Sequence, residues 1–169
     1  MIKLFVIDVD GTLTDGSIIY DDNGTEIKSF NTRDGAAFFA LKAMGIKIMI
    51  LTGRECRATE RRMTEMRVDY LFQDVDNKSD FLHAFCENNN YSKEEVAYIG
   101  DELNDISAMR LCGSVGCPSD ACKEVKEMAD YISEKNGGEG VLRDIVEHYF
   151  DELGVWTQVV EKIYNITGK

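Results

Sequence analysis

Short apolar segments alternate with longer segments of helical periodicity along most of the chain. Buried strands, apolar on both faces and rich in β-branched residues, are predicted at 3–9, 46–51 and 96–99. Shorter strands are predicted at 69–72, 114–117 and 131–132, and helices at 33–44, 55–66, 78–89, 104–111, 121–128 and 140–150. This alternation predicts an α/β fold with a Rossmann-like parallel sheet and helices on both faces.

The segment 16–30 departs from this alternation. Two strand-like runs flank Asn23-Gly24, a pair that predicts a β-hairpin whose two turn positions both have positive φ. The hairpin protrudes after the first strand and carries several apolar side chains that one domain face does not cover. We therefore interpret 1–169 as one domain that oligomerises through this hairpin. The helix at 33–44 is expected to bury the face formed by Ala36, Phe39, Ala40 and Ala43.

Composition narrows the possible functions. The net charge is −12, which argues against a nucleic-acid partner, since such a partner requires a basic face. No apolar run approaches the ~18 residues that a membrane span needs, and the first residues do not resemble a signal peptide, so we expect a cytoplasmic protein without a membrane partner. The five cysteines form no Cys-x-x-Cys pair, which favours reduced thiols over a zinc site or disulfides.

Polar clusters follow the predicted strands. Asp8-Val9-Asp10-Gly11-Thr12 ends the first strand, Thr52-Gly53-Arg54 the second, and Gly100-Asp101-Glu102-Leu103-Asn104-Asp105 a third, while Lys78 opens a helix. Each cluster alone also fits an ordinary strand end, helix cap or surface lysine. Because the carboxyl ends of parallel strands share one sheet edge, the clusters are expected to meet there. Together they supply carboxylates, phosphate-binding donors and oxygen ligands suited to Mg²⁺, the parts needed for phosphoryl transfer.

The order of these clusters resembles the four motifs of the haloacid dehalogenase superfamily of phosphatases. Over nearly its whole length, the chain further resembles the capless 3-deoxy-D-manno-octulosonate 8-phosphate phosphatases. The resembling segments are DVDGTLTDG at 8–16, YDDNGTEIKSFNTRDG at 20–35, LTGR at 51–54, DYLFQDVDNK at 69–78, AYIGDELND at 97–105 and NGGEGVLRDIVE at 136–147.

The resemblance implies a role for each motif residue. Asp8 is the nucleophile that forms an aspartyl-phosphate, and Asp10 protonates the leaving oxygen and then activates water. Lys78 stabilises the charge on Asp8 and the phosphoryl group. Thr52 and Gly53 bind that group. Mg²⁺ is held by Asp8, the main-chain carbonyl of Asp10 and Asp101, with Asp105 in support.

An arginine-rich segment, 54–67, follows the second strand. Arg54, Arg57 and Arg61 are expected to share one helical face, on which a substrate carboxylate could dock. For Arg57 and Arg61, a solvated face paired with neighbouring glutamates is an equally good interpretation. We place Arg54 and also Arg62 among the candidate phosphate- or substrate-binding residues.

The implied substrate is a small anionic sugar phosphate. We rank 3-deoxy-D-manno-octulosonate 8-phosphate first because Arg54 occupies a position where relatives that prefer nine-carbon acids carry glutamate. A nine-carbon ulosonate 9-phosphate remains the alternative, since the segment 137–140 resembles that group as much. The resembling family also implies a homotetramer. A non-catalytic oligomerisation module, as found fused to sialate cytidylyltransferases, is the alternative of another class, although such modules carry damaged motifs.

Overall fold

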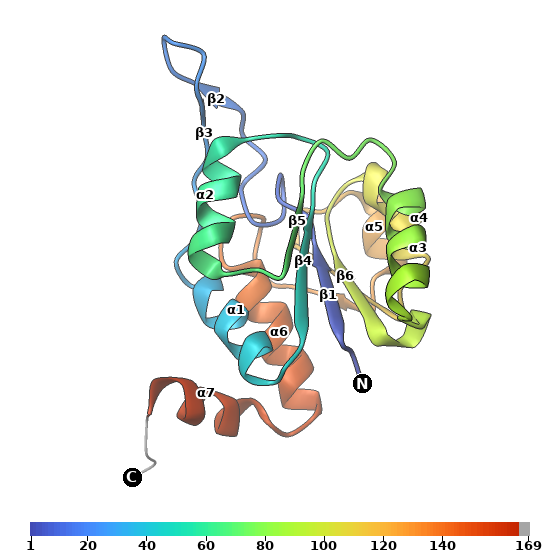
Figure 1. Cartoon of the computed structure of the whole chain (residues 1–169). Helices are drawn as coiled ribbons and strands as arrows, with labels where there is room; N and C mark the ends of the chain where they lie inside the picture. Colours follow the sequence, from blue (N-terminus) through green and yellow to red (C-terminus); the bar gives the residue numbers. More distant parts are fainter. Residues whose placement is uncertain (166–169) are drawn as a thin grey trace.

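A six-stranded parallel sheet forms the centre of the computed structural model, which describes residues 1–165 (Figure 1). The strands are ordered β5-β4-β1-β6-β7-β8. Their bounds are β1 Leu4–Ile7, β4 Lys47–Leu51, β5 Tyr70–Phe72, β6 Val96–Ile99, β7 Ser114–Cys117 and β8 Tyr131–Ile132. In register, Phe5 of β1 lies between Ile48 of β4 and Ala97 of β6. The predicted parallel sheet is confirmed.

Helices cover both faces of the sheet, and alternate residues of β1 supply both cores. Phe5 and Ile7 pack with the first helical layer, whereas Leu4 and Val6 pack with the second. The first layer contains α1 (Asp34–Ala43), α2 (Arg57–Met66), α6 (Val141–Glu152) and α7 (Trp156–Tyr164). The second contains α3 (Lys78–Asn89), α4 (Ile106–Met109) and α5 (Lys123–Met128), with short 3₁₀ turns η1 (Lys93–Glu95) and η2 (Leu103–Asp105).

The buried face predicted for one helix needs correction, and another helix was not predicted. Helix α1 buries Ala37, Phe38 and Leu41 together with Ala40, so the buried stripe is rotated from the predicted one, and Phe39 is exposed. The stripe is set by contact with α6, and a pattern of apolar residues all around a short helix leaves its buried face ambiguous. Helix α7 was not predicted, although it packs on α1 through residues such as Trp156 and Val159.

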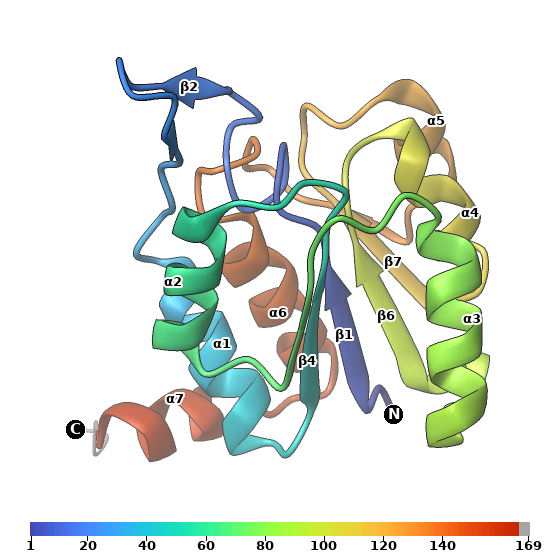
Figure 2. The same ribbon diagram turned by 45° about the horizontal axis from the view of Figure 1, so that its top comes forward.

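The predicted hairpin exists, but its turn differs. Strands β2 (Ile19–Tyr20) and β3 (Glu26–Ile27) pair antiparallel and project from the body of the molecule (Figures 1 and 2). Of the two turn residues, only Gly24 has positive φ, at 79°. The Asp21 carboxylate instead organises the turn by accepting hydrogen bonds from the backbone N–H groups of Asn23 and Thr25.

The structure also bears on membrane crossing and on the state of the cysteines. No helix among residues 1–165 is long and apolar enough to cross a membrane. All five cysteines are free thiols.

A buried carboxylate joins α1 to α6. Asp34 opens α1, and its Oδ1 accepts a hydrogen bond of 3.0 Å from the backbone N–H of Arg143 in the first turn of α6. No side chain of α6 or of the residue before it caps this helix, so Asp34 supplies the missing acceptor. Burial raises the pKa of Asp34 from 3.8 to about 6, although backbone N–H groups of Arg143 and Leu142 oppose the shift.

This raised pKa predicts a pH-dependent loss of stability. Folding favours the protonated Asp34, so its contribution is fully present below about pH 4 and is lost as the pH rises through the folded-state pKa of about 6. Asp34→Asn cannot ionise. The free energy of unfolding of wild type, relative to this variant, should fall by roughly 3 kcal/mol or less between pH 4 and pH 7. Urea unfolding of both proteins across this range checks it, and parallel curves would contradict it.

Candidate active site

The polar clusters meet at the carboxyl edge of the sheet. The loops after β1, β4 and β6 lie together above the strand ends (Figure 2). These three strands are adjacent, so the segments carrying Asp8, Thr52 and Asp101 are brought side by side. Helix α3 reaches the same edge with its first residue, Lys78.

Lys78 lies between two carboxylates and is buried with them. Its Nζ donates to Asp8 Oδ1 at 2.6 Å and to Asp105 Oδ1 at 2.7 Å. Burial lowers the pKa of Lys78, but the charges of Asp8 and Asp105 outweigh burial, and the net pKa is raised. The ammonium therefore stays charged at the positive end of a helix, an otherwise unfavourable place.

Asp105 is held by a complete set of donors. Besides Lys78, its Oδ1 accepts a hydrogen bond of 2.7 Å from the Tyr98 hydroxyl. Its Oδ2 accepts from the backbone N–H groups of Asp101 and Glu102, at 3.1 and 3.3 Å. Asp105 thus orients Lys78 and the loop after β6. Sequence analysis missed Tyr98, because a tyrosine inside a buried strand looks like an ordinary core residue.

An acidic cluster beside Lys78 fits a divalent cation. Oxygen atoms of Asp8, Asp101 and Asp105 lie within 4.8 Å of one another. Burial and neighbouring carboxylates raise the pKa of Asp8 to about 8, against the opposing effect of Lys78. Burial likewise raises the pKa of Asp101 to about 7, although its hydrogen bond from Thr12 opposes this. The buried Asp8 and the half-buried Asp101 are both disfavoured as anions, and their carboxylate oxygens are ligands that suit Mg²⁺.

The backbone at Gly11 packs very closely against the Asp101 carboxylate. Gly11 has φ of 91°, and a Cβ there would lie 2.1 Å from Asp101 Oδ2. On its other side, a Cβ on Gly137 would lie 2.0 Å from the carbonyl oxygen of Gly11. The loop that contains Gly137 therefore packs directly on the loop that carries Asp8 and Asp10. The segment 136–147 resembles the family in sequence, but its contact with Gly11 was not predicted.

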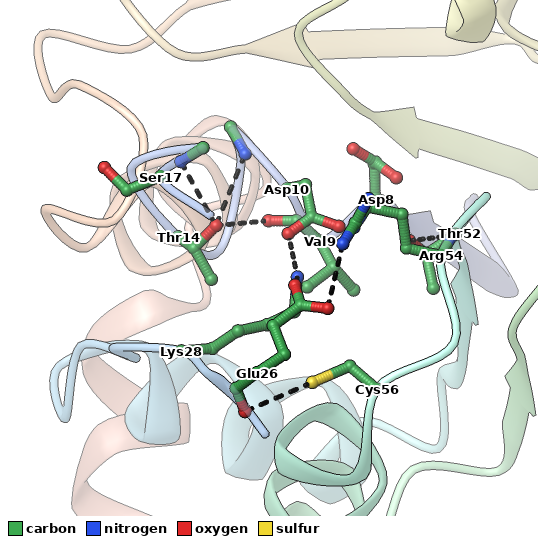
Figure 3. Close-up of polar contacts among 12 residues, drawn as sticks. Asp8, Val9, Asp10, Thr14, Ser17, Glu26, Lys28, Thr52, Arg54 and Cys56 are labelled. Atoms are coloured by element: carbon green, nitrogen blue, oxygen red, sulfur yellow. Dashed lines mark hydrogen bonds and ion pairs between the residues drawn. The ribbon is translucent and has the colours of Figure 1, made fainter. Parts of the chain in front are cut away.

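Asp10 contacts the hairpin through its side chain. Its Oδ1 accepts a short hydrogen bond from Lys28 Nζ, and Lys28 Nζ also lies 3.1 Å from Glu26 Oε1 (Figure 3). The Lys28 side chain is 1% exposed. Sequence analysis missed both partners. The available signal was their spacing: Glu26 and Lys28 flank Ile27 and so share the opposite face of an extended segment.

The arginines are arranged differently from the prediction. Helix α2 begins at Arg57, so Arg54 lies in the preceding loop and does not share a helical face with Arg57 and Arg61. Arg54 Nη2 donates to Glu26 Oε2 at 2.9 Å and to the Tyr20 hydroxyl at 3.2 Å. Its Nε is buried without a hydrogen-bond partner among residues 1–165.

The remaining candidate residues lie on α2 and directly after β4. Arg61 and Arg62 both face Glu65 on α2, each at 3.4 Å, as the solvated-face interpretation anticipates for Arg61. Thr52 is buried at the end of β4, and Gly53 follows it at the same sheet edge as Asp8. The geometry therefore brings together Asp8, Asp10, Thr52, Lys78, Asp101 and Asp105, while Arg62 makes its ion pair away from them.

Several known proteins are similar to this chain in sequence. Residues 71–145 match the family model of haloacid dehalogenase-like hydrolases. The 3-deoxy-D-manno-octulosonate 8-phosphate phosphatase of Escherichia coli K12 is 34% identical over 146 residues, which cover 86% of this chain and 78% of that protein. The corresponding phosphatase of Haemophilus influenzae is 34% identical over 153 residues, or 90% of this chain and 85% of that protein.

Solved structures agree with the sequence comparison. The 3-deoxy-D-manno-octulosonate 8-phosphate phosphatase of Moraxella catarrhalis, in complex with a magnesium ion, a phosphate ion and a KDO molecule, superposes with a TM-score of 0.91 at 35% identity. The match covers 95% of this chain and 92% of that one. The cobalt-bound enzyme of Haemophilus influenzae gives a TM-score of 0.87 at 32% identity, covering 92% and 91% of the two chains. This chain therefore belongs to the 3-deoxy-D-manno-octulosonate 8-phosphate phosphatase family of haloacid dehalogenase-like hydrolases, and it is a phosphoric monoester hydrolase.

Proposed function

We propose that this chain hydrolyses 3-deoxy-D-manno-octulosonate 8-phosphate in a magnesium-dependent reaction that passes through a phosphoryl group on Asp8. The observation that carries the proposal is the buried Asp8–Lys78–Asp105 arrangement in a chain of this family. A carboxylate fixed by an ammonium is oriented for attack, and the same ammonium stabilises charge on the phosphoryl oxygens.

The residues divide the reaction into two displacements. In the first, Asp8 forms a bond to phosphorus, the bond from phosphorus to the sugar oxygen breaks, and Asp10 gives its proton to that oxygen. In the second, water attacks phosphorus, Asp10 takes a proton from the water, and the bond to Asp8 breaks. Thr52 and the backbone of Gly53 bind the phosphoryl oxygens throughout.

The metal site is proposed from the donor set. Mg²⁺ would be held by Asp8, Asp101 and the main-chain carbonyl of Asp10, because the oxygens of Asp105 are already occupied by hydrogen bonds. When bound, the ion neutralises the carboxylates and polarises the phosphoryl group. Thr12 donates to Asp101 Oδ1 at 2.8 Å and so orients that ligand.

Substrate choice is proposed to involve Arg54. Its guanidinium lies next to the proposed phosphate-binding loop, and its side chain is 38% exposed. A substrate carboxylate would accept from this side chain. Arg62 is paired with Glu65 on α2, so its proposed role is secondary.

The hairpin is proposed to mediate a homotetramer. Ile18, Ile19, Tyr20 and Ile27 are 51%, 49%, 59% and 49% exposed. Such a group of apolar side chains on a projecting hairpin favours burial against other copies. The free thiols fit the cytoplasm, where we propose that the enzyme acts.

Replacing the two catalytic aspartates should separate their roles. Asp8→Asn removes the nucleophile and should abolish turnover, while Asp10→Asn should slow it by ~10²–10⁴-fold, the usual contribution of an acid–base group. Phosphate release from 3-deoxy-D-manno-octulosonate 8-phosphate measures both, with circular dichroism as the control for folding. Wild-type turnover in Asp8→Asn would exclude the proposed mechanism.

The substrate ranking can be tested with one assay. We expect a higher kcat/KM for the eight-carbon 8-phosphate than for nine-carbon ulosonate 9-phosphates, and no activity after metal stripping in chelator until Mg²⁺ is restored. Arg54→Ala should lower kcat/KM by ~10–100-fold for the ulosonate, and less for p-nitrophenyl phosphate, which has no carboxylate. A preference for a nine-carbon substrate would reverse the ranking, and full activity in chelator would exclude the metal.

The assembly can be tested by weakening the hairpin surface. Wild type should be a tetramer by light scattering at micromolar concentration, and Ile19→Asp should shift it to smaller species because a charge is costly in a buried apolar contact. Leu153→Asp, at a position of similar exposure after α6, is the matched control and should leave the tetramer intact. A monomeric wild type would refute the proposed assembly.

A further inference from the structure

We propose that Lys28, on the return side of the hairpin, is a positioning residue for Asp10, and that Glu26 fixes Lys28 in turn. This inference rests on the proposed acid–base role of Asp10. It assigns part of the catalytic geometry to the hairpin, which lies outside the four motifs.

The contacts form a continuous chain of alternating charge. Asp10 pairs with Lys28, Lys28 pairs with Glu26 at 3.1 Å, and Glu26 pairs with Arg54 at 2.9 Å (Figure 3). The side chains of Lys28 and Glu26 are only 1% and 11% exposed, whereas that of Asp10 is 21% exposed and open to a substrate. A buried ammonium therefore holds one oxygen of a carboxylate at the mouth of the site.

The hairpin is fixed at its base, which makes Lys28 a rigid partner. Glu26 divides its two oxygens between two cations, so that Oε1 faces Lys28 and Oε2 accepts from Arg54. The main-chain carbonyl of Glu26 also faces the Cys56 thiol at 4.0 Å. These contacts hold the β3 segment against the loop after β4, and Lys28 then extends to the loop after β1.

Asp10 needs such a partner because Asp10 and Glu26 are both anionic and share Lys28 as their common cation. Without Lys28, the carboxylates of Asp10 and Glu26 would face each other with no cation between them and would repel. Asp10 would then turn to other rotamers. A reacting group displaced by about 1 Å can lose ~10²-fold in rate, so the ion pair has a direct catalytic consequence.

Leaving-group dependence distinguishes positioning of the acid from general damage. A sugar alkoxide must be protonated as it leaves, whereas p-nitrophenolate leaves without a proton. Lys28→Met, which keeps the length of the side chain, should lower kcat/KM by ~10–100-fold for alkyl and sugar phosphates, but by less than ~3-fold for p-nitrophenyl phosphate. Lys28→Arg should restore part of the loss, and Glu26→Gln should give a smaller loss in the same pattern.

The matched control is Lys47→Met. Lys47 makes a comparable ion pair, with Asp69 at 2.7 Å, but lies on the surface at the start of β4. This variant should retain wild-type kcat/KM on every substrate. Equal losses on alkyl and aryl phosphates in Lys28→Met would overturn the positioning role.

Thermal unfolding tests the pair itself without any turnover. If Lys28 and Asp10 interact, the Tm loss of the double variant Lys28→Met, Asp10→Asn should be smaller than the sum of the two single losses. Additive losses would overturn the contact even in a protein that is active. A wild type inactive on every phosphate monoester would instead refute the proposed function, while the Tm comparison would still decide whether the pair exists.

Discussion

The buried ammonium of Lys78 is the interaction on which the site depends. Its Nζ donates hydrogen bonds to Asp8, in the first motif, at 2.6 Å and to Asp105, in the last motif, at 2.7 Å. Removing either partner of a buried ion pair leaves an uncompensated charge, typically at a cost of about 3–5 kcal/mol. The full hydrogen bonding of Asp105 by Tyr98 and two backbone N–H groups lowers the cost of burying these charges and fixes their positions.

A second group of paired charges involves Asp10 and the hairpin. The hairpin brings Lys28 and Glu26 to Asp10 and Arg54, so residues that are 18 and 28 positions apart are paired in one neutral chain. The proposed nucleophile, Asp8, and the proposed acid–base residue, Asp10, are thus held by separate cations, one from α3 and one from the hairpin. This separation allows the two aspartates to remain close in sequence without sharing a partner.

The placement of the motif residues at strand ends and at the start of a helix could be predicted from the sequence. The parallel sheet, the start of α3 at Lys78 and the meeting of the motifs follow from local patterns and the sheet-edge rule. Contacts between distant segments could not be predicted. Asp34 caps α6 across 109 positions, and Tyr98 looks like core until Asp105 is placed beside it. The helical face proposed for Arg54 failed because α2 begins three residues later.

The net charge of −12 remains compatible with an anionic substrate because the charges are resolved locally. Each buried acid near Asp8 faces Lys78, Lys28, Arg54 or the proposed metal position, and the cation closest to solvent among these side chains is Arg54, at 38% exposed. Surface carboxylates are screened within about 8–10 Å at physiological salt. For a phosphate at the sheet edge, attraction to the proposed donors Thr52, Gly53 and Lys78 would therefore outweigh repulsion by the distant surface carboxylates.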